Sequence, residues 1–323
     1  MPMDFWHKLK KPYFVLAPME GVTDIVFREV VEKATRPDVF FTEFTNVSSF
    51  ASEKGRPSAI SRLEFTKKEQ PIVAQIWGKK PEHFAITAQG VKNMKHKAID
   101  INMGCPDRKV VRSGGGANLI RHPKLAAKII AATKTADLPV SVKTRIGYSR
   151  IDEWRDWLTF LLEQDLSAIT VHLRTKKEMS KVPAHFVLIP EILSLRDKLS
   201  PQTAIIINGD IKTRVSGEKL AKKFDIDGIM IGRGIFENPF CFEKKSKVHS
   251  QDEYLGLLKS HLDIFEKYVQ KRTSDPSLKA PKFDPLKRFF KIYVRDFSDS
   301  SKIRAKMMRR KSVQEIREIL EEL

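Results

Sequence analysis

Short apolar segments alternate with amphipathic segments along about the first 235 residues of the chain. Eight segments are rich in β-branched and other apolar residues and are bounded by glycine, proline or charge, which is typical of buried strands. These predicted strands are Tyr13–Met19, Val39–Phe44, Ile72–Trp77, Ala98–Met103, Val140–Arg145, Ala168–Arg174, Ala204–Asn208 and Gly228–Gly232.

Segments with helical periodicity lie between most of these strands. They are Asp24–Ala34, Pro81–Asn93, His122–Ala136, Asp152–Gln164, Phe186–Leu199 and Val215–Phe224. Eight strand-helix units in this length predict an α/β fold of the closed (β/α)8 TIM-barrel type. A doubly wound open sheet is the alternative, because periodicity fixes neither closure nor strand order.

The pattern changes to helices alone after about residue 245. The predicted helices are Asp252–Val269, Lys287–Asp296, Lys302–Arg310 and Ser312–Leu323, the last begun by a capping box of Ser312 and Glu315. We therefore expect two domains, a barrel over residues 1–245 and a small all-α domain over residues 246–323.

Charge adds a candidate partner to this picture. The chain of 323 residues has 59 Lys and Arg against 40 Asp and Glu, a net charge of +19. The segment from Lys279 to Lys311 contains twelve basic residues and three aspartates. Such an excess favours a polyanion such as nucleic acid, although a generally lysine-rich composition gives the same number.

The sequence lacks the features of secreted, membrane-spanning and disulfide-rich proteins. There is no apolar N-terminal signal and no apolar run near 18 residues, so we expect a cytoplasmic protein without a membrane partner. Two cysteines, Cys105 and Cys241, are too few for a disulfide framework, and scattered histidines predict no metal site.

Nearly every predicted strand ends in polar or glycine-rich residues. In a parallel barrel these ends meet at one rim, which is where such folds carry out chemistry. The last two strands end in Asn208-Gly209-Asp210 and Gly232-Arg233-Gly234. Glycines with an arginine at this place predict a phosphate site, and hence a phosphorylated cofactor.

Two further residues at the rim suggest redox chemistry. Lys143 would point inward and needs an anionic partner, which a reduced flavin provides, while Gln75 could bond the flavin pyrimidine edge. The alternative is a pair between Lys143 and a carboxylate such as Glu43 or Asp100. Cys105 follows the fourth strand, and an ordinary thiol is protonated at neutral pH, so it can serve as a general acid.

The assembled motifs resemble those of the tRNA-dihydrouridine synthases, FMN-dependent enzymes that reduce uridine in tRNA. The resemblance rests on six motifs in order over about 220 residues. They are Ala17-Pro18-Met19-Glu20-Gly21-Val22-Thr23-Asp24, Asn102-Met103-Gly104-Cys105-Pro106 with Gly116-Ala117-Asn118-Leu119, Val142-Lys143-Thr144-Arg145, Thr170-Val171-His172-Leu173-Arg174-Thr175, Asn208-Gly209-Asp210-Ile211 and Ile231-Gly232-Arg233-Gly234.

This resemblance implies a reaction and a set of residue roles. Hydride would pass from flavin N5 to uracil C6 after reduction by NADPH or NADH, and Cys105 would give the proton to C5. The FMN would be held by Pro18, Met19, Gln75, Lys143 and His172, with its phosphate on Asn208, Asp210, Gly232 and Arg233. Asn102, Arg145 and Arg174 would bind the substrate base.

The resemblance further implies an oxidoreductase that acts, as a monomer, on tRNA bound by the helical tail. One segment departs from the family pattern, since Lys176-Lys177-Glu178-Met179-Ser180-Lys181 stands where an aromatic residue and a glycine are usual. The alternatives are a barrel flavoenzyme acting on a small molecule, similar to dihydroorotate dehydrogenases or ene-reductases, and a non-catalytic RNA-binding protein.

Overall fold

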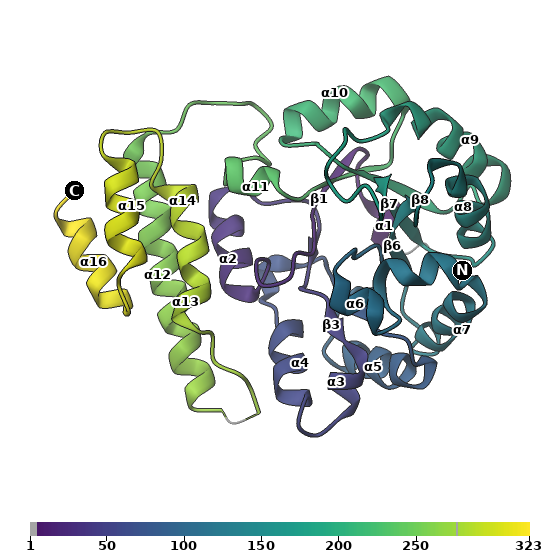
Figure 1. Ribbon diagram of the computed structural model, residues 1–323, viewed down its shortest axis with the longest axis horizontal. Coiled ribbons are helices and arrows are strands. Elements are labelled where there is room, and N and C mark those ends of the chain that lie inside the picture. Colours follow the sequence, from purple (N-terminus) through teal and green to yellow (C-terminus); the bar gives the residue numbers. More distant parts are fainter. Residues whose placement is uncertain (1–4, 276) are drawn as a thin grey trace.

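The computed structural model describes residues 5–275 and 277–323, and within these ranges nine parallel strands form one curved sheet (Figure 1). Neighbours follow the order β1-β9-β8-β7-β6-β5-β4-β2, and β3 pairs with β4. The strands are β1 (Tyr13–Leu16), β2 (Phe40–Phe41), β3 (Thr45–Asn46), β4 (Ile72–Trp77), β5 (Ala98–Met103), β6 (Val140–Gly147), β7 (Ala168–Thr175), β8 (Ala204–Asn208) and β9 (Gly228–Ile231).

The two ends of this path meet. Val15 of β1 forms a parallel bridge with Val39, the residue before β2, and Leu16 N donates to Val39 O at 3.1 Å. This bridge turns the sheet into a barrel, which confirms the predicted TIM-barrel class and rules out the open doubly wound sheet.

Alternating residues of each strand divide the core into two layers. Tyr13, Val15 and Ala17 pack inside the barrel, whereas Phe14 and Leu16 belong to the larger core between strands and helices. At the amino-terminal end of the strands, Trp6 of α1 (Phe5–Lys8) is 1% exposed and packs on Tyr13 with ring centroids 5.7 Å apart. The amino-terminal end of the barrel interior is therefore filled with side chains.

The second predicted strand is interrupted in the structure. Val39–Phe44 becomes the two-residue strand β2, and β3 begins after it. The cause is Thr42, whose Oγ1 accepts from Gln75 N at 3.1 Å and donates to the Glu43 carbonyl at 2.9 Å. A side chain thus replaces the backbone in the ladder, and the chain bends there.

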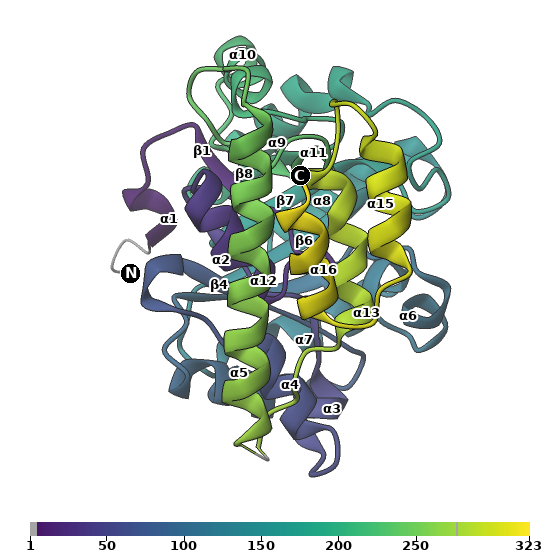
Figure 2. The same cartoon turned by 90° about the vertical axis from the view of Figure 1, so that its left-hand side faces the viewer.

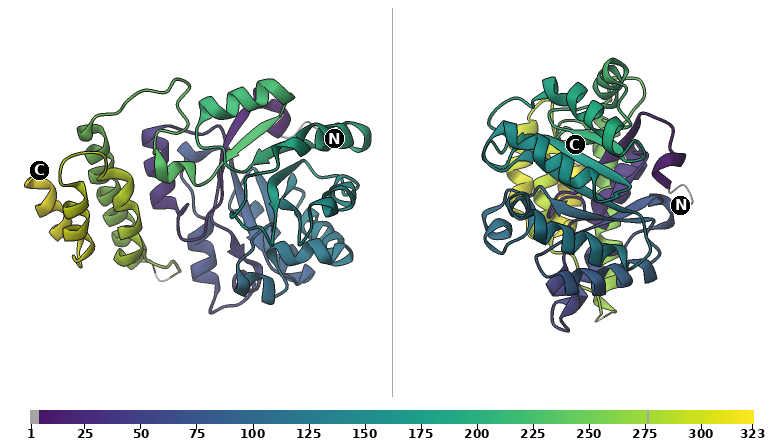
Figure 3. Two further views of the ribbon diagram at one scale, coloured as in Figure 1. Left: turned by 45° about the horizontal axis from the view of Figure 1, so that its top comes forward. Right: turned by 90° about the vertical axis from the view of Figure 1, so that its right-hand side faces the viewer.

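Helices surround the barrel, as Figure 3 shows from two further directions. Asp24 caps α2 by accepting from Phe27 N at 2.9 Å. The longer helices are α2 (Ile25–Ala34), α4 (Arg56–Leu63), α5 (Pro81–Asn93), α7 (Pro123–Lys134), α8 (Trp154–Leu162), α9 (Ile189–Leu199) and α10 (Arg214–Phe224). The shorter ones are α3 (Val47–Ala51), α6 (Arg108–Arg112), α11 (Gly234–Glu237) and the 3-10 turns η1 (Lys67–Glu69), η2 (Gly116–Arg121), η3 (Ile151–Glu153) and η4 (Phe186–Leu188).

The rest of the chain is helical. It consists of α12 (Gln251–Thr273), α13 (Phe283–Leu286), η5 (Lys287–Phe289), α14 (Phe290–Tyr293), α15 (Ser300–Met308) and α16 (Val313–Glu321). The capping box of Ser312 and Glu315 is confirmed. The predicted helix Lys287–Asp296 consists of η5 followed by α14, and it ends at Tyr293, before the predicted end.

The helical tail, meaning α12 to α16, packs against α2 beside the open rim (Figure 2). Phe27 of α2 stacks on Phe289 with centroids 4.5 Å apart. Tyr268 donates to Glu29 at 2.5 Å, and Arg272 pairs with Glu64 at 2.7 Å. Of the helices that the structure describes, none has the length and apolar character needed to cross a bilayer.

Candidate active site

A cavity of about 500 Å³ opens at the carboxyl-terminal rim of the barrel. Loops after β1, β5, β6, β7, β8 and β9 build it, as expected for this fold. Ten of the predicted site residues line it, namely Pro18, Met19, Lys143, Arg145, His172, Arg174, Asn208, Asp210, Gly232 and Arg233. The other three, Gln75, Asn102 and Cys105, lie beside it and contribute no wall.

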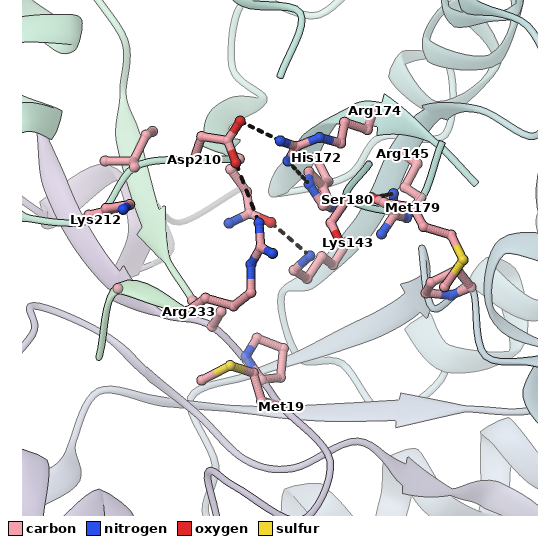
Figure 4. A pocket seen from close by; sticks show the side chains of 18 of the residues that line it. Met19, Lys143, Arg145, His172, Arg174, Met179, Ser180, Asp210, Lys212 and Arg233 are labelled. Carbon is pink, nitrogen blue, oxygen red and sulfur yellow. Dashed lines mark hydrogen bonds and ion pairs between the residues drawn. The ribbon is translucent and has the colours of Figure 1, made fainter. Parts of the chain in front are cut away.

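Cations dominate the end of the cavity formed by β8 and β9. Figure 4 shows Arg174 and Arg233 pointing toward Asp210 from two sides. Asp210 Oδ2 accepts from Arg174 and from Ala184 N, and Arg233 lies 3.4 Å from Oδ1. The Asp210 carboxylate is thus engaged in holding arginines, and these arginines, with Lys212, make this end attractive to a phosphate.

Lys143 stands on the floor of the cavity. Its Nζ donates to Asn208 Oδ1 at 3.2 Å, and within the described residues no carboxylate lies at ion-pair distance from it. The predicted alternative of a direct pair with Glu43 or Asp100 is therefore wrong. Burial, followed by the charge of Arg145, lowers the pKa of Lys143 to about 8, so an anionic ligand would stabilise its charged form.

His172 is neutral in this surrounding. Burial and the charges of Arg145, Lys143 and Arg174 hold its pKa well below the ordinary value. Its Nε2 lies 3.2 Å from Arg174 NH1, which can only donate, so the ring proton is on Nδ1. The ring is thus a fixed hydrogen-bonding group and not a charge.

Cys105 follows β5 in a tightly held loop. Its N–H and that of Gly104 both donate to Asn102 Oδ1, at 2.9 Å and 3.1 Å. The thiol is half-buried, and burial raises its pKa above the ordinary value, although Arg145 and Lys143 act in the other direction. It is therefore protonated at neutral pH, as an acid must be.

Glycine is required next to this cysteine. Gly116 has φ +58°, and a Cβ there would stand 2.8 Å from the Cys105 carbonyl oxygen. The glycine-rich stretch Ser113–Gly116 joins α6 to η2, with Gly115 and Gly116 buried.

The amides of Gln75 and Asn102 are engaged with protein groups. Asn102 Nδ2 donates to Gln75 Oε1 at 3.0 Å, and Gln75 Nε2 donates to Asp100 Oδ2 at 2.7 Å. Gln75 is 0% exposed and Asn102 5%. Both residues lie in the layer beneath the cavity.

Arg145 ties two loops of the rim together. Its Nε donates to the Gly104 carbonyl, and its NH1 donates to the carbonyls of Thr175 and Met179, each at 2.9 Å. Met179 has φ +54°, is 45% exposed and lines the cavity with Ser180. The sequence signal for Met179 was the atypical segment Lys176–Lys181; Lys212 and Glu237 were missed because no motif includes them.

Across residues 5–275 and 277–323, no group of three or more His, Cys, Asp or Glu residues is arranged to hold a metal ion.

Comparison with known proteins gives a consistent result. The model of the family described as "Dihydrouridine synthase (Dus)" matches residues 15–322. The "Probable tRNA-dihydrouridine synthase 2" of Bacillus subtilis (strain 168) is 52% identical over 322 residues, covering 100% of this chain and 97% of that protein. A "Probable tRNA-dihydrouridine synthase" of Staphylococcus epidermidis is 54% identical over 321 residues, covering 99% and 96%.

Solved structures show likeness in fold alone. Histamine dehydrogenase from Rhizobium sp. 4-9 aligns with a TM-score of 0.52 at 11% identity, over 78% of this chain and 46% of that one. A 2-naphthoyl-CoA reductase aligns with a TM-score of 0.50 at 9% identity, over 71% and 49%.

Proposed function

The chain belongs to the dihydrouridine synthase family, and from this membership we propose a residue-level account of how it reduces uridine in tRNA to 5,6-dihydrouridine. The observation that carries this function is the family match over residues 15–322, joined to identities above 50% along the whole chain. The enzyme is an oxidoreductase that uses a flavin, and the identity of that flavin, the reductant and the roles of single residues are our proposals.

The cavity suits FMN in size and in charge. Arg174, Arg233 and Lys212 would meet the phosphate, with the backbone at Asn208, Gly209 and Gly232 approaching it closely. Asp210 would act by orienting the two arginines. At Gly232 the nearest atoms to an added Cβ are Ala17 Cβ at 3.5 Å and Met19 Sδ at 3.9 Å, so room remains for a ligand.

The ring of the flavin would lie over Lys143 and beside His172, Pro18 and Met19. The ammonium of Lys143 would stabilise the negative charge that a reduced flavin carries near N1 and O2. The hydride for uracil C6 is what the cofactor would supply when bound.

Cys105 would complete the reaction by proton transfer. Hydride addition at C6 leaves an enolate whose C5 must be protonated, and the thiol, kept protonated by burial, would give that proton. The thiolate left behind would be stabilised by the charges of Lys143 and Arg145 and would regain its proton from water. Arg145, through its remaining NH2 group, and Arg174 would contact the base.

Two basic surfaces beside the cavity would hold the RNA. One is the tail surface, Lys302, Lys306, Arg309 and Arg310 on and after α15, which surrounds a shallow hollow. The other, called here the rim surface, is centred on Tyr148, over whose ring Arg121 lies at 3.9 Å and Lys176 at 4.9 Å. It includes Arg108, Lys109, Arg112, Arg121, Lys176, Lys177 and Lys181, which form no ion pair within the described residues. Contacts on both sides would pull one nucleotide out of its stack and into the cavity.

We extend this account to the reductant, the domains, the oligomeric state and the compartment. The electrons come from NADPH, or else from NADH. Residues 1–245 form the catalytic domain and residues 246–323 the RNA-binding domain. The enzyme works as a monomer, and it works in the cytoplasm, where its substrate is made.

The test is mass spectrometry of RNA from cells that lack this protein. Uridines that it modifies should lose two mass units, and the wild-type gene should restore them. Complementation with Cys105→Ala is the matched control and should not restore them. Unchanged dihydrouridine in the deleted strain, together with no reduction of transcribed tRNA by the purified flavoprotein, would overturn the proposal.

A further inference from the structure

A chain of four buried side chains runs beneath the Cys105 loop. Ser141 Oγ donates to Asp100 Oδ1 at 2.7 Å, and Gln75 Nε2 donates to Asp100 Oδ2 at 2.7 Å. Asn102 Nδ2 donates to Gln75 Oε1 at 3.0 Å, and Asn102 Oδ1 accepts from the N–H groups of Gly104 and Cys105. The exposure of these four side chains is 5% or less.

Every link of this chain points in one direction, which Asp100 fixes at one end and the N–H groups of Gly104 and Cys105 fix at the other. An ionised carboxylate only accepts, so the Gln75 amide must turn its NH2 toward Asp100 and its oxygen toward Asn102. Asn102 must then turn its NH2 toward Gln75, which leaves its oxygen for the backbone of the Cys105 loop. If Gln75 were turned the other way, its oxygen would face the carboxylate and its NH2 would face that of Asn102, both without water.

Asp100 is ionised under ordinary assay conditions. Burial raises its pKa to about 6, while hydrogen bonds from Ser141 and Gln75 and the charge of Lys143 lower it. It is 0% exposed and does not line the cavity, so it reaches neither cofactor nor substrate.

We propose that Asp100 is a positioning residue, which orients the amides of Gln75 and Asn102 and thereby holds the Cys105 loop in the geometry needed for proton transfer. This inference rests on the proposed role of Cys105 in dihydrouridine synthesis. The main role of Gln75 and Asn102 is then to connect Asp100 with the Cys105 loop, in addition to any contact with the flavin.

The direction of the hydrogen bonds in this chain of side chains can be reversed by exchanging the carboxylate at position 100 with the amide at position 102. Asn102→Asp removes the donor that Gln75 needs, so that Gln75 lies between two carboxylates, and their repulsion displaces the side chain at position 102 together with the Cys105 loop, whose N–H groups still bond to it. Asp100→Asn added to Asn102→Asp restores the two bonds of Gln75 with opposite direction, since the new amide at position 100 then donates to Gln75, and Gln75 donates to the new carboxylate at position 102. The bonds from Ser141 and from the N–H groups of Gly104 and Cys105 keep their direction. Asp100→Asn alone should have a smaller effect than Asn102→Asp, because the new amide oxygen can still accept from Gln75 while Ser141 turns to accept from the new NH2 group.

The readout is the rate at which iodoacetamide alkylates Cys105 in cofactor-free protein, followed by peptide mapping to separate it from Cys241. Asn102→Asp should change this rate about tenfold, the equilibrium effect of one lost buried hydrogen bond, and the double variant should return to within about twofold of wild type. Thermal melting identifies any variant that does not fold. In that case the exchange of Gln75→Glu with and without Asp100→Asn serves as the second pair, with the same expected rescue.

A double variant no closer to wild type than Asn102→Asp would overturn the proposal, as would an Asn102→Asp variant with an unchanged rate. A purely structural role of Asp100 gives additive defects and no rescue. Because alkylation needs neither flavin nor RNA, its result is independent of the assay for uridine reduction, and each idea can fail alone.

Discussion

Arg145 Nε donates a hydrogen bond of 2.9 Å to the carbonyl oxygen of Gly104, the residue directly before Cys105. The same guanidinium reaches the loop after β7 through the carbonyls of Thr175 and Met179. It therefore fixes the proposed acid relative to the loop that replaces the family's usual aromatic and glycine.

Arg145→Lys should separate these two loops. A lysine keeps the charge but cannot span three carbonyls with the fork of a guanidinium, so kcat should fall about tenfold to 100-fold while flavin is retained. Single-turnover reduction of transcribed tRNA measures this change. A variant with wild-type kcat would show that the connection between the loops is not needed.

Cys105→Ala should lose turnover while keeping flavin and RNA affinity, because only proton transfer is removed. The expected loss is about 10²-fold to 10⁴-fold in single-turnover rate. Cys241→Ala is the control, since Cys241 is buried away from the cavity wall and should leave the rate unchanged. Equal rates for Cys105→Ala and wild type would remove the thiol from the mechanism.

Flavin affinity should fall as the pH rises through about 8. In the cofactor-free protein the pKa of Lys143 is lowered to about 8, first by burial, so the ammonium is present below this pH and lost above it. Titration of free FMN fluorescence from about pH 7 to about pH 9 measures the effect. Lys143→Met should bind more weakly and without this pH dependence, and a flat wild-type curve would contradict the assignment.

Replacing Lys177 and Lys181 with alanine should weaken RNA binding and make it less sensitive to salt. Each phosphate contact contributes about 0.7 to 0.9 to the slope of log affinity against log salt, so the slope should decrease by roughly one to two. Lys219 and Lys222 on α10 are exposed as well, and their replacement with alanine is the charge-matched control. Identical slopes for the two double variants would exclude the rim surface from RNA binding.

Acid should destabilise the fold partly through His96. Burial lowers the pKa of His96 from 6.5 to about 3. Between these pH values the unfolded chain therefore binds a proton at His96 that the folded chain does not bind. The stabilising contribution is complete above about pH 6.5 and is lost as the pH falls, by about 1.4 kcal/mol per unit. The stability of His96→Leu, from urea unfolding, should therefore decline less steeply than wild type in this range, and parallel curves would contradict this.

The sequence predicts the barrel well because each strand is a short apolar run that ends in residues of one rim. Its boundaries fail where a side chain takes over a backbone role, as Thr42 does between β2 and β3. The helix expected at Lys287–Asp296 ends early, at Tyr293, because Val294 leaves helical backbone geometry and its carbonyl accepts from Arg304, a residue of α15.

Sequence motifs predict where the site residues lie, but they do not predict the direction of the hydrogen bonds that these residues form. A motif places Asn102 and Arg145 at the rim, and the structure finds Arg145 in the cavity wall and Asn102 in the layer beneath it. Only the three-dimensional contacts reveal that Asn102 accepts from the Cys105 loop and that Arg145 spends three donors on backbone carbonyls. Hydrogen-bond direction depends on partners far apart in the sequence, such as Asp100 and Gln75, and no local pattern encodes it.

The stack of Phe27 on Phe289 makes the tail a poor candidate for exchange between enzymes. Helix α2 supplies the apolar surface on which the tail rests, and it begins only a few residues after Pro18 and Met19 in the cavity wall. Anyone building a chimera to alter which RNA is recognised would have to transplant α2 together with the tail, and would disturb the flavin site in doing so. With the proposed roles of the tail in RNA binding and of the cavity in flavin binding, substrate choice and cofactor binding would be inherited as one unit.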